Sequence, residues 1–265
     1  MTHFDDIGFN FQKPEELAEF LNGQLPSAKI HLPLIKVSEN PYLIYEIKLG
    51  QIRFFVTTGA GSEGKPELVC ANPGFLGSIW RKFRIEKIYK KEDCNYCIIF
   101  SGALEAQNPQ SKESFSPQDQ DMAEKTLATE AHFQVLNYLT RENELKPGDI
   151  IDVNLVIFPH SLNVSKKEET EMHGVFIQTK QIKELPRGTT KDIPDDVYGL
   201  AGEIKDWKEL ENPVSKCKFL YLVLYQEILG DFEVVAPMPP QEVFQEKIQR
   251  GNIVFCEGWL SGVIR

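Results

Sequence analysis

Residues 59–66, GAGSEGKP, are the first place where residue types and spacing suggest chemistry. They fit the glycine-rich dinucleotide fingerprint, and also a phosphate loop that lacks its last residue. A phosphate loop needs backbone N–H groups around the phosphates, a lysine that reaches them, a hydroxyl on Mg²⁺ and a helix behind the anion. Lys65 is correctly spaced, but Pro66 stands where Ser or Thr is required and supplies neither a hydroxyl nor an N–H group.

The surroundings of this loop also argue against nucleotide binding. After Pro66, only ELVCA precedes Asn72-Pro73-Gly74, which is too short for the helix that a dinucleotide site requires. A nucleophilic Ser62 on a strand-to-helix turn would need the same helix. We therefore expect a loop that joins two antiparallel strands, with no catalytic residue and no cofactor.

The sequence offers weak candidates for metal binding. Cys94 and Cys97 form one CNYC motif that runs into an apolar, strand-like segment. Residues three apart on a strand point to opposite faces, and a zinc site needs two further ligands at suitable spacing. Isolated histidines are more often surface or capped residues than ligands: His132, His160 and His173. We expect no metal.

A basic stretch at 81–91, RKFRIEKIYKK, interleaves cations with aromatic residues. Arg81, Lys82 and Arg84 could contact phosphates of a single-stranded nucleic acid while the aromatic rings stack on bases. The alternative is an edge strand that its charges protect from pairing.

Aromatic residues near the C-terminus suggest a different binding surface. Tyr221 and Tyr225 share one face of a predicted strand, and Trp259 lies opposite the core residues of the closing stretch. Residues 195–265 carry 12 Asp/Glu against 7 Lys/Arg, a net charge of −5, which argues against a phosphate-rich ligand. An exposed face of this kind suits a protein or peptide partner, but burial against the N-terminal part would remove the argument.

The pattern of elements predicts an α+β fold. Residues 42–58 and the segments up to residue 104 favour a mainly antiparallel sheet, and the polar segment 104–117 is typical of a loop. A long helix should follow, because Ser116 can cap it and four apolar residues recur at helical spacing. These four residues are Leu127, Ala131, Val135 and Tyr138.

The C-terminal segment predicts a second, smaller unit. Three strands, a helix and a closing strand follow one another, which is the order of a small OB-like β-barrel, although a split sheet covered by one helix also fits. Gly258 and Gly262 should lie where a coiled barrel strand has no room for a side chain. We expect domains at 1–185 and 195–265, with a linker at 184–196. There is no clean internal repeat, although LKPGDIIDV and IQRGNIVFC are weakly similar.

Four segments near the two ends of the chain resemble a family of bacterial, chiefly clostridial, proteins of unknown function. They are FDDIGF, YGLAGEI, EILGDFEVVAP and GWLSGVI. The resemblance covers the two ends of the chain, and the middle departs from it. It implies a bacterial origin and a shared fold, but no activity.

Composition narrows the class of protein. The net charge of −10 repels nucleic acid and anionic membranes unless cations cluster locally. Five cysteines are sparse and odd in number, and no apolar run is long enough to span a membrane. We expect a cytoplasmic, non-enzymatic binding or protein-interaction module with Tyr221, Tyr225 and Trp259 as its site. The alternatives are nucleic-acid binding through 81–91 and a small-molecule enzyme without a recognisable motif.

Overall fold

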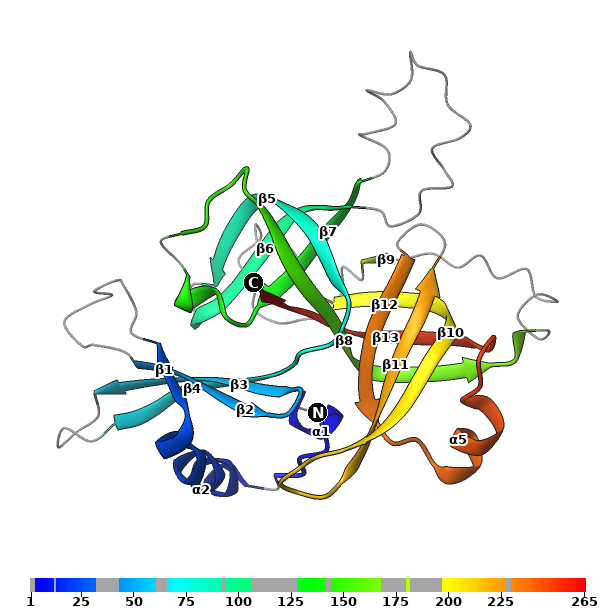
Figure 1. Ribbon diagram of the computed structural model, residues 1–265, viewed down its shortest axis with the longest axis horizontal. Helices are drawn as coiled ribbons and strands as arrows, with labels where there is room; N and C mark the ends of the chain where they lie inside the picture. Colours follow the sequence, from blue (N-terminus) through cyan, green and yellow to red (C-terminus); the bar gives the residue numbers. More distant parts are fainter. Residues whose placement is uncertain are drawn as a thin grey trace, which may run out of the picture.

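The computed structural model describes residues 3–11, 13–31, 43–60, 66–91, 94–105, 128–141, 144–167, 180–181, 197–226 and 230–265 (Figure 1). Within these residues, the fold consists of two β-sheets and a few short helices. The longest described helix is α2, Pro14–Gln24. None of the described helices is both long and apolar enough to cross a membrane.

The predicted α+β class with a long helix is wrong, because the described fold is mostly β. Strand β7, Ala128–Val135, occupies part of the predicted helix, and it pairs with a strand on each side. Ala131 and Val135 are four residues apart, so they share one face of a strand as well as one face of a helix. Phe133 lies between them and is also buried, which fits the period of two. The first part of the predicted helix, from Ser116, lies outside the described residues.

The smaller sheet is antiparallel throughout and has the order β1-β2-β3-β4. Its strands are β1 (Lys29–His31), β2 (Leu43–Leu49), β3 (Ile52–Ala60) and β4 (Pro66–Phe75). A turn joins β2 to β3, with Gly50 at a φ of 65° that favours glycine. Helices α1 (His3–Asp6) and α2 pack on one face of this sheet, where the rings of Phe4 and Phe20 contact Phe54.

The larger sheet has nine strands in the order β11-β12-β8-β5-β6-β7-β13-β10-β9. Its first strands are β5 (Trp80–Lys91), β6 (Cys94–Glu105), β7 and β8 (Ile150–Ser165). A 3-10 turn, Tyr138–Thr140, follows β7. The remaining strands are β9 (Lys180–Gln181), β10 (Val197–Glu211), β11 (Lys218–Gln226), β12 (Gly230–Pro237) and β13 (Ile253–Ile264). Helix α5, Gln241–Lys247, lies between the last two strands, as predicted.

Two rings of strands share β8 and β13. The first ring runs β5-β6-β7-β13-β8 and returns to β5. The second runs β10-β11-β12-β8-β13 and returns to β10. In Figure 1 the long green strand β8 passes from the first group of strands to the second. The largest apolar cluster, which includes Phe83, Phe133, Leu222 and Val254, draws residues from both rings.

The two rings repeat the same local contacts. Ile85 of β5 receives a hydrogen bond from the N–H of Gly148 at 2.7 Å and donates to the carbonyl of Asp149 at 2.9 Å. Ile204 of β10 receives a bond from Gly251 at 2.9 Å and donates to Asn252 at 2.8 Å. Both glycines have positive φ, 97° and 91°. The weak similarity of LKPGDIIDV to IQRGNIVFC therefore coincides with a structural repeat.

The small OB-like barrel predicted for residues 195–265 is not formed by that segment alone. Its strands β12 and β13 pair with β8, which comes from the first part of the chain. The sequence order of the C-terminal elements cannot reveal this, because the strand that completes the ring lies upstream of the whole segment. The boundary between residues 1–185 and 195–265 remains a prediction, and the predicted linker, residues 184–196, lies outside the described residues.

Candidate functional site

Strand β4 forms one edge of the smaller sheet. It pairs with β3 on one side, and no strand in the described ranges pairs with its other side. Leu68 and Val69 on this strand are 41% and 44% exposed. Four other large apolar residues of the described chain are exposed: Ile30, Ile150 and Tyr225 on three different strands, and Val214 in the turn between β10 and β11. Strand β4 is therefore where exposed apolar side chains lie next to each other on a free edge.

A β-bulge lies within this exposed part of β4. Thr57 of β3 pairs with Cys70 and Thr58 pairs with Leu68, so Val69 is the extra residue on β4. A bulge takes its extra residue out of the ladder and changes the direction of the side chains around it. Glu67, Leu68 and Val69 are all exposed, so both faces of β4 are open at this end of the strand.

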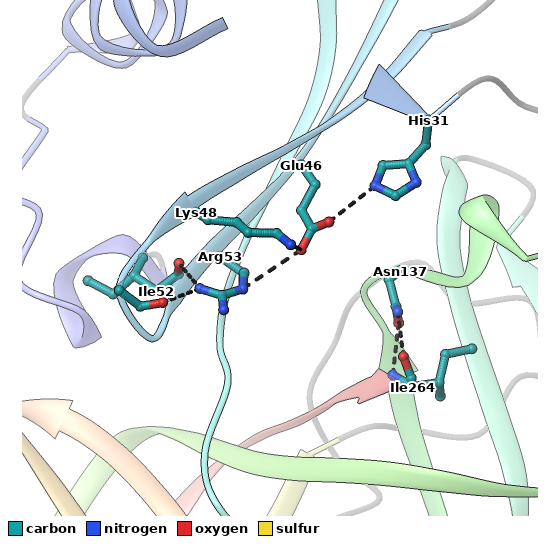
Figure 2. Close-up of polar contacts among 8 residues, drawn as sticks. His31, Glu46, Lys48, Ile52, Arg53, Asn137 and Ile264 are labelled. Carbon is teal, nitrogen blue, oxygen red and sulfur yellow. Dashed lines mark hydrogen bonds and ion pairs between the residues drawn. The ribbon is translucent and has the colours of Figure 1, made fainter. Parts of the chain in front are cut away.

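A second candidate is a polar cluster around Glu46 on β2, shown in Figure 2. Nε2 of His31 lies 3.1 Å from Oε2 of Glu46. Nζ of Lys48 and Nε of Arg53 lie 3.5 Å and 3.7 Å from the other carboxylate oxygen. Nη1 of Arg53 also donates to the carbonyl of Ile52 at 2.9 Å and to that of Gly50. Arg53 is thus fixed against both the turn and the carboxylate.

The Glu46 cluster could support proton transfer. If Nε2 of His31 donates to Glu46, Nδ1 carries the lone pair and can accept a proton. Glu46 would orient the imidazole, as a carboxylate does behind a catalytic histidine. Burial lowers the pKa of Arg53, and the charge of Glu46 acts in the opposite direction. Within the described ranges, Glu46 is the one hydrogen-bond partner of the His31 side chain, so no nucleophile lies against it.

Figure 2 also shows Asn137 and Ile264, whose hydrogen bonds close the end of β13. The side-chain amide of Asn137 donates to the carbonyl of Ile264 at 2.7 Å and accepts from its N–H at 2.9 Å. One side chain thereby replaces a strand partner. The pair is a structural contact and adds no group that reaches Glu46.

The predicted aromatic surface is not assembled. Tyr221 is only 5% exposed, and its ring lies 5.5 Å from that of Phe75 on the smaller sheet. Burial against the N-terminal part therefore removes Tyr221 as a partner contact. Tyr225 is 40% exposed, whereas Trp259 is partly buried and packs edge to face on His160 with ring centroids 5.1 Å apart.

Tyr225 and Trp259 are also far from each other. Tyr225 pairs with Glu203 and Trp259 pairs with Val197, both on strand β10. These two positions on β10 are separated by a strand length of about 20 Å. The two aromatic residues therefore do not form one continuous patch.

Tyr221 is buried because it completes a polar network around Glu233, which has no exposed surface. One carboxylate oxygen accepts from the Tyr221 hydroxyl at 2.5 Å and from the N–H of Ser78 at 2.6 Å. The other accepts from the amide of Asn154 at 2.6 Å. Burial, followed by the hydrogen bond to Glu233, raises the pKa of Tyr221 above its usual value. The closed network anchors the connection from β4 to β5 and leaves no access for a ligand.

The basic strip is not a continuous phosphate-binding surface. Arg81 is 4% exposed, and its guanidinium carbon lies 5.2 Å from the ring centre of Phe232. Burial lowers the pKa of Arg81 to about 10, although Asp231 acts in the opposite direction. Lys82 and Arg84 are exposed, and Lys82 forms an ion pair with Asp152 at 2.9 Å. The edge-strand alternative does not hold for residues 80–84, which pair with β8, but residues 87–91 pair with β6 alone among the described strands.

The strands around the glycine-rich loop are antiparallel, as predicted, and Pro66 begins a strand where a nucleotide site would need a helix. Residues 61–65 of the loop lie outside the described residues. Cys94 begins strand β6, so the CNYC motif does run into a strand. No group of three or more potential metal-binding side chains occurs in the part of the chain that the structure describes.

The sequence analysis predicts neither the exposed edge of β4 nor the Glu46 cluster as a site. The apolar segment ELVCA indicates a strand, but the bulge at Val69 depends on the register with β3. In LIYEIKL, Glu46 and Lys48 alternate with apolar residues, which is a usable signal for a polar face. The contact of His31 with Glu46 spans fifteen positions and depends on the pairing of β1 with β2.

Comparison of the chain with family models, with curated proteins and with solved structures found no match.

Proposed function

We propose that this protein is a non-enzymatic binding module that takes up an extended segment of a protein partner along the free edge of β4. The observation that carries this proposal is the adjacent exposure of Leu68 and Val69 on that edge. Strand addition uses the unpaired backbone groups of an edge for affinity and side-chain contacts for specificity. Natural proteins commonly protect such edges with charged residues, prolines and β-bulges. Strand β4 has prolines at positions 66 and 73 and a bulge at Val69, but between the prolines Glu67 is the one charged residue.

The edge defines the chemistry of the partner. Prolines at positions 66 and 73 have no N–H group and bound the segment that can pair, residues 67–72. The partner would be a short extended segment with an apolar residue facing Leu68 or Val69. A basic residue opposite Glu67 would add a favourable cross-strand pair.

The cytoplasm is the proposed location. Cys70, Cys217 and Cys256 are free thiols, which fits a reducing compartment. The resemblance to the family of bacterial proteins remains a prediction and supports a bacterial cytoplasm.

A peptide-display experiment tests the β4 proposal. Peptides selected on the immobilised protein are titrated by fluorescence polarisation against the wild type, Leu68→Lys/Val69→Lys and the control Ile150→Lys. Ile150 is also apolar and 57% exposed, but lies on β8. We expect at least a tenfold loss of affinity for the β4 variant, because lysines block an edge, and no loss for the control. Equal affinity for all three proteins would contradict the proposal.

Two further results would point to different occupants. Concentration-dependent dimerisation that the β4 lysines abolish would identify a second copy of the chain. Salt-sensitive binding of single-stranded DNA that requires Lys82 and Arg84 would favour the nucleic-acid alternative.

A small-molecule enzyme is the second candidate, and the hydrogen bond between His31 and Glu46 is the observation that favours it. An activity found by substrate screening should be lost in His31→Asn and retained in Leu68→Lys/Val69→Lys. The reverse pattern would exclude the Glu46 cluster as its site.

A further inference from the structure

The N-terminal segment 3–9 is held by the turn that joins β10 to β11. The amide of Asn212 donates to the carbonyl of Ile7 at 2.7 Å, and the hydroxyl of Ser215 donates to that of Gly8 at 2.6 Å. Gly8 has a φ of 77°, and a Cβ at this position would lie 3.0 Å from the carbonyl oxygen of Cys217. The turn thus binds the backbone of a segment that lies more than two hundred residues away in the sequence.

The same segment covers an apolar surface. Phe4, Ile7 and Phe9 are buried in the cluster that also contains Phe54 and Tyr221. The ring centroids of Phe4 and Phe9 lie 5.8 Å and 5.4 Å from that of Phe54. Displacement of residues 3–9 would therefore expose one face of the smaller sheet.

Asp6 lies inside this contact. Its side chain is 1% exposed, and Oδ1 has no hydrogen-bond partner among the described residues. Burial, and then the nearby Asp5, raise the pKa of Asp6 from 3.8 to about 8, although the positive charge of the N-terminal amine acts in the opposite direction. An ionised carboxylate in such a position is costly unless a cation or hydrogen-bond donors compensate it.

Phe4 of α1 contacts Phe54 of β3, and the one cation of β3, Arg53, lies against Glu46. The other strands packed against α1 are β4, β8 and β12, and none of them contains Lys or Arg. Their titratable residues are Glu67, Cys70, Asp152, His160, Asp231 and Glu233. Asp152 pairs with Lys82, His160 with Glu257 and Asp231 with Lys205. Glu233 is satisfied by Tyr221, Ser78 and Asn154. The charge that acts on Asp6 from its own helix is that of Asp5.

We propose that residues 3–9 form a pH-dependent latch, which is closed while Asp6 is protonated and opens when Asp6 ionises. In the open state the carboxylate reaches water, and the apolar face around Phe54 becomes accessible. Asp6 has a raised pKa in the closed state and a pKa of 3.8 when it is exposed in the open state. The closed state is therefore favoured most strongly below about pH 4, where Asp6 is protonated in both states. That advantage is lost as the pH rises to about 8, and it changes little at higher pH.

Hydrogen exchange followed by mass spectrometry tests the latch in the full chain. Protection of the peptide that spans residues 3–9 is measured from pH 5 to pH 10 and corrected for the intrinsic pH dependence of exchange. We expect protection to fall by about tenfold per pH unit up to about pH 8 and then to level off, because opening releases one proton. A peptide from β13 serves as the internal reference and should not follow this course.

Two variants test whether Asp6 is the group that releases the proton when the latch opens. Asp6→Asn cannot ionise, so protection of residues 3–9 should become independent of pH. Asp5→Asn is the matched control: it should retain the dependence and level off at a lower pH, because the repulsion that raises the pKa of Asp6 is removed. The wild-type measurement alone can overturn the proposal, if protection of residues 3–9 does not change with pH. An unchanged pH slope in folded Asp6→Asn would overturn it as well.

Discussion

The hydroxyl of Tyr221 donates a 2.5 Å hydrogen bond to Oε1 of Glu233 on the neighbouring strand, inside the protein. A carboxylate with no exposed surface is tolerated when donors satisfy its oxygens, and Ser78 and Asn154 provide the others. Gly77 is required beside it, because a Cβ there would overlap the carboxylate. Since Ser78 belongs to the connection between β4 and β5, this buried group ties the smaller sheet to the larger one.

Replacement of Glu233 should destabilise the protein strongly. Glu233→Gln puts an amide N–H₂ group among donors, and we expect a loss of about 3 kcal/mol in the free energy of unfolding. Tyr221→Phe removes one donor and should cost about 1–2 kcal/mol. Urea unfolding followed by circular dichroism measures both changes. A Glu233→Gln protein as stable as the wild type would show that the network does not hold the sheets together.

Two glycine substitutions should have opposite effects. A Cβ on Gly258 would overlap the carbonyl oxygen of Phe158, so Gly258→Ala should cost about 2 kcal/mol or more. A Cβ on Gly23 in helix α2 would meet no atom within 4 Å, and Gly23→Ala should stabilise by about 0.5–1 kcal/mol. Thermal unfolding of the two variants gives the sign of each change. A Gly258→Ala protein with an unchanged melting temperature would contradict the close strand contact.

Local patterns in the sequence predict local structure well. The antiparallel pairing of β2 with β3 and of β3 with β4 follows from strand-like runs around short breaks. The crowding at Gly258 and Gly262 is also predicted correctly, since a Cβ at either position would overlap atoms of a neighbouring residue. These features depend on neighbouring residues and on the period of a strand.

Features that depend on distant strands are not predictable in this way. Tyr221 and Tyr225 lie four residues apart on β11 and so share one face of the strand. The smaller sheet packs on Tyr221 and not on Tyr225. The free edge at Val69 requires the register between β3 and β4, and the Glu46 cluster requires β1 to pair with β2. Tertiary contacts therefore decide which predicted residues remain accessible.

The two described cysteines of the C-terminal part should differ in reactivity. Burial raises the pKa of Cys256 to about 12, so little thiolate forms at pH 8, whereas Cys217 is exposed. Alkylation by iodoacetamide, mapped by peptide mass spectrometry, should modify Cys217 first and Cys256 only in denaturant. Similar rates for both thiols in the folded protein would contradict the burial of Cys256.

Separate production of residues 1–185 and 195–265 tests the shared rings. The second fragment lacks β8, which pairs with β13 from Ile253 to Ile264 and with β12 at Glu233 and Val234. The first fragment lacks β13 and keeps β8 without that partner. Each fragment alone should therefore show broad amide resonances and no cooperative unfolding, because its ring is open.

When mixed, the fragments should recover a cooperative transition as β8 and β13 pair across the cut. Residues 195–265 with Val254→Asp provide the control, since Val254 is fully buried and the charge should prevent association. Sedimentation and near-ultraviolet circular dichroism measure the recovery. Cooperative unfolding of residues 195–265 alone would show that this segment closes a barrel without β8, which the observed strand pairing does not allow.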